Sequence, residues 1–259
     1  MNAKPTVLLT STVAFACAIY LSVTAHEFSH ALAGVALYLG TTVYPNHVEF
    51  SLASASQRIT TALTGPLFSL ISGLIILALP LHGRGFGRLL WLWLGLVSVQ
   101  TFNGYLMTGP FVRQGDIGQA LQLLSAPTWV AWLGFVVGAT GTFLLGRVAT
   151  RRFLELTDPA QGPLAPQLRQ VGLFAWLLGV VLAVLGGSIV DQVSWIGLFE
   201  LMGVLSSGIF VFLVRFYMTR LPTQSGTGLK VGLPWGGLLL FAVIALFRFF
   251  VLRTGLRLA

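Results

Sequence analysis

Long apolar segments separated by short polar connections run along almost the whole chain. Seven of them hold about 20 residues or more, the length that a helix needs to cross a bilayer. The apolar positions show no alternation of period two, which favours helices over a transmembrane barrel. We therefore expect an all-α polytopic membrane protein with about six to seven transmembrane helices. The segments are residues 6–39, 59–80, 86–107, 127–146, 171–190, 196–217 and 233–252.

Two of the connections are long enough to carry structure of their own. Residues 41–58 combine β-branched residues and alternating polarity around Pro45 and Asn46. This pattern predicts a short β-hairpin-like segment, or an extended loop, at the membrane edge. Residues 147–170 are rich in Arg and Pro and too short for a folded domain. We expect them to form a polar linker.

The composition places the chain in lipid. Of the 259 residues, 56% are hydrophobic and only 8% are charged, whereas a soluble domain is about 25% charged. The lipid bilayer is therefore the expected surrounding, and the backbone must satisfy its own hydrogen bonds. The single cysteine, Cys17, excludes an intrachain disulfide and a zinc site built on cysteines.

The positive charge follows the connections rather than forming a patch. A net charge of +8 would indicate nucleic acid binding in a soluble protein, but here the basic residues lie in short loops between apolar segments. This is the distribution that the positive-inside bias produces, so we expect no nucleic acid partner. Of the 15 Lys and Arg, ten fall on the side of the N-terminus, four on the other side, and Arg248 inside the last segment. The count favours a cytoplasmic N-terminus.

The first segment also has features of a signal peptide. Lys4, the apolar run after it and Val23-Thr24-Ala25 resemble such a peptide with its cleavage site. The apolar pattern continues through residues 31–39, however, and the rest of the chain is itself apolar. These features favour a first segment that stays in the membrane.

His26, Glu27 and His30 are the most informative polar residues. Histidines four residues apart project from the same face of a helix, one turn apart. They can share one zinc ion, while Glu27 beside them can take a proton from water. Ionisable side chains at depth in lipid are costly and usually functional. The alternative is a helix that ends near Ala25 and leaves these residues at the membrane interface.

A catalytic zinc site needs a third protein ligand, and the sequence offers few. Ala36 occupies the position where a metzincin has its third histidine. Glu49 is near the distance of a thermolysin-like ligand, but its segment has β character. His47 and His82 lie in connecting segments, where solvated histidines are common. Asp116, which follows the third apolar segment, is the remaining candidate.

Several of these residues belong to stretches that resemble the site-2 protease family (M50) of intramembrane zinc metallopeptidases. The first is HEFSHALAG at residues 26–34, and the second is ALTGP at residues 62–66. The third element of that family is an Asn, a Pro and then Leu-Asp-Gly. Asn103, Pro110 and Asp116 follow one another in this order, at the corresponding place.

The resemblance covers roughly residues 5–125, with Gly115 and Ile117 where the family has Leu and Gly. It implies a catalytic membrane core at residues 1–125 and accessory transmembrane helices at residues 126–259. Family members that begin at the catalytic helix usually have that helix running inward, which is opposite to the charge count.

What the resemblance implies for the chemistry is specific. His26, His30 and Asp116 would hold Zn²⁺, which lowers the pKa of bound water to near 7. Glu27 would remove the proton and later deliver it to the leaving amine. Asn103 would stabilise the oxyanion. The expected function is that of a zinc-dependent endopeptidase that cleaves a transmembrane protein substrate.

Two alternatives stay open at this point. Ser29, Gln100 and Thr101 are polar residues that could line a water path to the zinc, or could simply pack between helices. The whole chain could also be a non-proteolytic homologue, either a regulatory scaffold or a metal-binding transporter. The intact Glu27 argues against this second alternative, because metal binding alone requires the histidines but not the base.

Overall fold

Helices make up most of the molecule. The computed structural model describes residues 5–51, 53–80, 84–112, 115–190, 195–218, 220, 228–229 and 231–258. The long helices are α1 (Pro5–Ala36), α2 (Ala55–Ala78), α3 (Phe86–Thr108), α5 (Thr128–Leu154), α7 (Ala175–Val190), α8 (Trp195–Met218) and α9 (Trp235–Phe247). The short ones are α4 (Asp116–Leu123), η1 (Pro159–Gln161) and α6 (Leu164–Leu168), with π-helical turns at η2 (Arg169–Phe174) and η3 (Arg248–Leu252).

Six helical segments in the described part of the chain are long and apolar enough to cross a membrane. They correspond to α1, α2, α3, α5, the run from α6 into α7, and α9 with η3. Helix α8 matches the sixth predicted segment and has a shorter apolar stretch, Leu205–Met218. The prediction of an all-α polytopic membrane protein with about six to seven such helices is confirmed.

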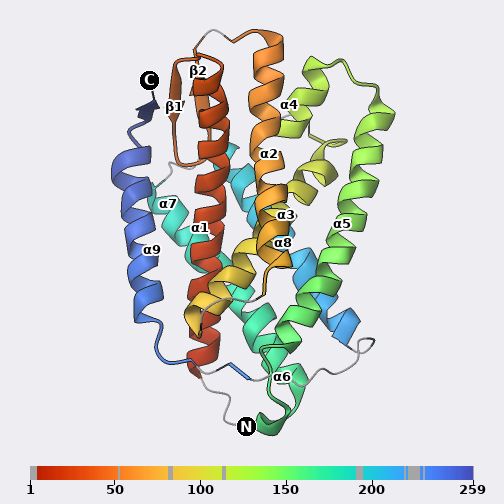
Figure 1. The fold of residues 1–259 in the computed structure, drawn as a ribbon, viewed down its shortest axis with the longest axis vertical. Coiled ribbons are helices and arrows are strands. Elements are labelled where there is room, and N and C mark those ends of the chain that lie inside the picture. The colour runs from red at the N-terminus through yellow and green to blue at the C-terminus, as the bar shows by residue number, and fades with distance from the viewer. Residues whose placement is uncertain are drawn as a thin grey trace.

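Helix α1 is the central element of the bundle (Figure 1). Helices α2, α3, α7 and α9 all pack against it. Its residues from Val13 to Tyr20 are only 0–3% exposed. Four of these eight residues are Ala or Cys, and small side chains let neighbouring helices approach closely, which is how helices associate in lipid. A helix covered on so many sides is held firmly in place.

A small antiparallel sheet lies at one end of the bundle, opposite the N-terminus of α1 (Figure 1). Its strands are β1 (Thr41–Val43), β2 (Val48–Phe50) and β3 (Leu256–Leu258), in the order β2-β1-β3. The hairpin predicted near residues 41–58 is thus present as β1 and β2. The third strand was not predicted, and it joins residues near the end of the chain to the segment that follows α1.

The boundaries differ from the predicted ones in two places. Helix α2 begins at Ala55, four residues earlier than expected, because Ser54 and Gln57 form a capping box. The prediction of a linker at residues 147–170 was wrong. Helix α5 continues to Leu154, and the residues after it form η1, α6 and the start of η2. Arg151 and Arg152 lie in the last turn of α5, where the helix dipole favours basic side chains.

Candidate metal centre

The two histidines lie within an unbroken helix. Helix α1 continues to Ala36, more than one turn beyond His30, so the motif is not at a helix end. The alternative of a helix that stops near Ala25 is therefore excluded. Both side chains are buried, and their Nε2 atoms are 3.1 Å apart. The helical spacing alone produces this pair.

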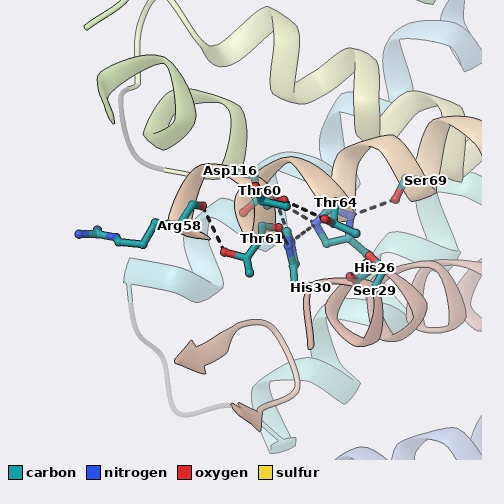
Figure 2. A network of polar contacts seen from close by, with 9 residues as sticks. All are labelled: His26, Ser29, His30, Arg58, Thr60, Thr61, Thr64, Ser69 and Asp116. Carbon is teal, nitrogen blue, oxygen red and sulfur yellow. Dashed lines mark hydrogen bonds and ion pairs between the residues drawn. The ribbon is translucent and has the colours of Figure 1, made fainter. Parts of the chain in front are cut away.

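Asp116 completes the cluster from a distant part of the chain. It is the first residue of α4 and follows Gly115, whose φ of +89° is a conformation that glycine adopts readily. Its Oδ2 lies 2.9 Å from Nε2 of His26 and 3.2 Å from Nε2 of His30. Figure 2 shows the three side chains converging, while Arg58 extends away from them.

The charge state of Asp116 follows from these neighbours. Burial raises the pKa of its carboxyl, but its interactions with the two imidazoles lower it more, so the pKa lies below its ordinary value. The side chain is therefore an ionised carboxylate at neutral pH. Its position in the first turn of α4 adds the favourable interaction of an anion with the positive end of a helix.

Nδ1 of each imidazole, the nitrogen that faces away from the cluster, is hydrogen-bonded to a residue of α2. Nδ1 of His30 lies 2.6 Å from the carbonyl oxygen of Thr61, and Nδ1 of His26 lies 2.9 Å from Oγ of Ser69. A carbonyl can only accept, so Nδ1 of His30 carries the hydrogen and its Nε2 is a bare lone pair when the ring is neutral. The hydroxyl of Ser69 permits the same tautomer in His26. Partners of this kind orient metal-binding histidines.

The geometry of the cluster fits a small divalent cation. Two imidazole nitrogens and a carboxylate oxygen, all electron-pair donors, face one another at 2.9, 3.1 and 3.2 Å. Neutral rings in this arrangement need a shared proton or a cation between them. Ligands about 2.0–2.1 Å from a tetrahedral zinc ion would be about 3.3 Å apart. The three residues are therefore suited to zinc in both chemistry and spacing.

Because Gly65 has no side chain, the two imidazoles fit against α2 at this position. A Cβ at this position of α2 would lie 2.6 Å from Nε2 of His26 and closer still to Nε2 of His30. Thr61, Gly65 and Ser69 are spaced four residues apart and so share one face of α2. The contribution of Thr61 and Ser69 was missed from the sequence, although this spacing around the Gly-Pro pair was a usable signal.

Glu27 borders a large cavity next to the cluster. Its side chain is 7% exposed, and it acts electrostatically on His30. The cavity measures about 1150 Å³ and is lined by residues of α1, α2, α3, α4, α8 and β2, together with Phe135 of α5. The predicted core and accessory parts therefore both contribute to its wall. Such a cavity can bring water and a peptide to Glu27.

Asn103 lies elsewhere than the resemblance implies. It is buried on α3, but its side chain packs against α5, where a Cβ on Gly141 would lie 2.6 Å from its Oδ1. The residues of α3 that line the cavity include Gln100, Thr101 and Gly104 but not Asn103. The structure thus brings together His26, Glu27, His30 and Asp116, and leaves Asn103 on a neighbouring face.

The other candidate ligands lie apart from the cluster. Nε2 of His47 is 3.8 Å from Oε1 of Glu49, and both belong to the segment around β2. His47 lines the cavity, whereas Glu49 does not. Ser29, which was considered for a water path and not as a ligand, donates a hydrogen bond to the carbonyl of His26 within α1. It does not line the cavity. His82 lies outside the described residues.

Comparison with known proteins gives no relative from which a role could be transferred. Searches with protein-family models, curated proteins and solved structures find no match.

Proposed function

We propose that this integral membrane protein is a zinc-dependent intramembrane endopeptidase of the site-2 protease type. The observation that carries the proposal is the convergence of His26, His30 and Asp116 at 2.9–3.2 Å beside Glu27. Two of these residues come from one turn of α1, and the third lies 86 positions after His30 in the chain. The sequence resemblance supports the same assignment independently of these distances.

The chain's own residues divide the work of peptide hydrolysis among them. His26, His30 and Asp116 would hold the metal. Bound zinc supplies Lewis acidity, which activates water near neutral pH and polarises a carbonyl. Glu27 takes a proton from the attacking water and delivers it to the amine of the departing chain. The hydrogen bonds that the imidazoles make to Thr61 and Ser69 keep both rings aimed at one point. The side chains of the site therefore need little reorganisation during the reaction.

A helical substrate must be opened before it can be cut, because its carbonyls are already hydrogen-bonded within the helix. The edge of the sheet offers a place for the opened chain. Strand β1 has neighbours on both sides, whereas β2 pairs only with β1 among the described strands. Val48 and Phe50 of β2 line the cavity. An extended segment added to β2 would run along the wall that Glu27 shares.

The first experiment combines zinc content with proteolysis. Purified wild-type protein should contain about one zinc per chain, as expected for a single three-ligand site, and cleave a fluorogenic apolar peptide in detergent. The His30→Ala and Asp116→Ala variants should lose both. The Glu27→Gln variant should keep its zinc while cleavage falls about 10²- to 10⁴-fold, the usual contribution of a general base.

Two results would contradict the proposal. A folded wild type without zinc would mean that the cluster serves another purpose. A cellular function that survives Glu27→Gln would favour the non-proteolytic alternative, a scaffold or a metal transporter, because neither role requires the base.

We further propose, from the charge count, that the N-terminus faces the cytoplasm. The end of the bundle that carries the sheet would then face the opposite side. Single cysteines placed beside Arg58 and beside Arg147, in a variant that lacks Cys17, would test this with a membrane-impermeant thiol reagent. Labelling of the first site alone in intact cells is the expected result, and labelling of the second alone would reverse the orientation.

A further inference from the structure

Gln100 of α3 has a buried side-chain amide whose NH2 group makes no hydrogen bond among the described residues. It is 1% exposed and yet lies in the wall of the cavity. Its Oε1 accepts a hydrogen bond from Oγ1 of Thr142 on α5 at 3.1 Å, whereas its Nε2 has no hydrogen-bond partner among the described residues. Buried donors are rarely left unsatisfied, and those that are require an explanation.

Gln100 belongs to the cavity wall because of its place on the helix. Gln100, Gly104 and Met107 recur with helical spacing, and all three line the cavity. Thr142 holds the oxygen end of the amide against α5. The nitrogen end of the same amide is buried in the wall of the cavity without a hydrogen-bond partner in the part of the chain that the structure describes.

Contacts between α1 and α3 fix the depth of Gln100. Ser98 is hydrogen-bonded to Ser22 at 3.1 Å, and the ring of Tyr105 stacks on that of His26 with centroids 5.6 Å apart. Gln100 lies between these two contacts, about 7.5 Å along the helix axis from Tyr105. An extended chain advances about 3.3 Å per residue, so for a substrate that runs along α3 this distance corresponds to roughly two residues.

We propose that Nε2 of Gln100 donates a hydrogen bond to a main-chain carbonyl of the bound peptide, about two residues from the bond that is cut. This inference rests on the proposed function. A chain opened inside the membrane exposes carbonyls that cannot be satisfied by lipid, and a helical substrate has no free carbonyl to offer. Gln100 therefore helps to select an extended backbone, and it takes a position that Asn103 does not reach.

The test measures peptide binding without cleavage. All proteins carry Glu27→Gln, and the probe is a fluorescein-labelled apolar peptide of about 12 residues with a central Gly-Pro, followed by anisotropy in detergent micelles. Removing the donor with Gln100→Leu or Gln100→Met should raise Kd about five- to tenfold, as expected for one lost hydrogen bond. The control is Ser98→Ala, which removes a buried contact of the same helix away from the cavity and should leave Kd unchanged.

Two Gln100 variants are used so that a folding defect in one does not decide the result, and zinc content and size-exclusion profiles verify both. An unchanged Kd in both, or no binding of the peptide by the parent protein, overturns the inference. So does an equal rise in Kd with Ser98→Ala, which would indicate a general effect of altered packing.

A second set of peptides locates the partner group. In each, one carbonyl is reduced to a methylene. The peptide whose missing carbonyl costs no further affinity in Gln100→Leu identifies the carbonyl bound by Gln100. Coupling to a peptide N–H instead of a carbonyl would overturn the inference.

Failure of the inference and failure of the proposed function give different results. If the protein with Glu27 intact cleaves the peptide while Gln100 variants bind it normally, only the inference fails. If Gln100 variants bind it weakly and the intact protein never cleaves it, the proposed function fails, and what stands is the hydrogen bond from Gln100 to the bound peptide.

Discussion

The two halves of α1 differ in what surrounds them, although they form one continuous helix. In the first half, Phe15 meets the ring of Trp93 edge to face at 4.9 Å, and Nε1 of Trp93 donates to Oγ of Ser11. In the second half, His26 and Glu27 face a cavity of about 1150 Å³. One half is closely packed, whereas the other borders a cavity and carries the ionisable side chains.

The difference suggests a division between support and chemistry. Lipid is as apolar as the interior of the bundle, so helices in a membrane associate through packing and hydrogen bonds. The packed half provides those contacts and fixes the direction of the helix. The half that borders the cavity can then hold ionisable side chains within the narrow positional tolerances that a metal site requires. Substitutions in the two halves should accordingly affect different properties.

Trp93→Ala should give the largest effect, and it should fall on stability alone. Deleting the indole leaves a void and removes the bond to Ser11, and a cavity of this size costs about 3 kcal/mol. Unfolding in mixed micelles would measure the loss. Zinc bound per folded chain should not change. A matching loss of zinc would mean that the two halves are not separable.

Gly65→Ala should have a slightly smaller effect, and in the other half. The new Cβ would collide with Nε2 of His26 and of His30, so zinc affinity should fall about 100-fold, the upper range for disturbed ligand orientation. Alanine is a better helix former than glycine, so a weaker α2 cannot explain the loss. Competition with a chromophoric chelator gives the affinity.

Gly73→Ala is the matched control in the same helix. Its Cβ would lie 2.8 Å from the backbone nitrogen of Val99, so α2 and α3 must separate, at about 1–3 kcal/mol. Zinc affinity should stay normal. Equal zinc affinities in the two glycine variants would show that contact with the imidazoles is not what Gly65 provides.

Ser69→Ala should have the smallest effect. It removes the partner of Nδ1 of His26, and loss of one such outer contact lowers metal affinity about tenfold. Ser72→Ala removes bonds to the carbonyls of Phe68 and, at 3.4 Å, of Ser69. It should leave the affinity unchanged, because it spares the Ser69 hydroxyl that contacts His26. The comparison fails if both serine variants bind zinc alike.

The sequence was most informative where the pattern is local. Apolar length predicted the spanning helices, and the spacing of His26 and His30 predicted their shared face, because both follow directly from helical geometry. Asp116 was the candidate that remained when the other possible ligands were set aside, and the resemblance indicated the same residue. The structure places its carboxylate 2.9 Å from Nε2 of His26. The capping box at Ser54 is also a local signal, and it was overlooked.

Features that depend on tertiary contacts could not be predicted in this way. Strand β3 has only three residues and no pattern of its own, and it is a strand because β1 lies beside it. The side of α3 on which Asn103 faces depends on the rotation of that helix against α5. Rotating α3 about its axis by less than half a turn would move Asn103 from its contact with Gly141 to the wall of the cavity.

The pairing of β1 with β3 also has a consequence for synthesis of the protein. The register places Leu256 opposite Val43, more than 200 residues earlier in the chain. At roughly 5–20 residues per second, translation needs about 10–40 s to cover that distance. During this interval β1 has only β2 beside it, and the strand that lines the cavity belongs to an incomplete sheet. The sheet that contributes β2 to the cavity wall is therefore completed only after α9 has been synthesised.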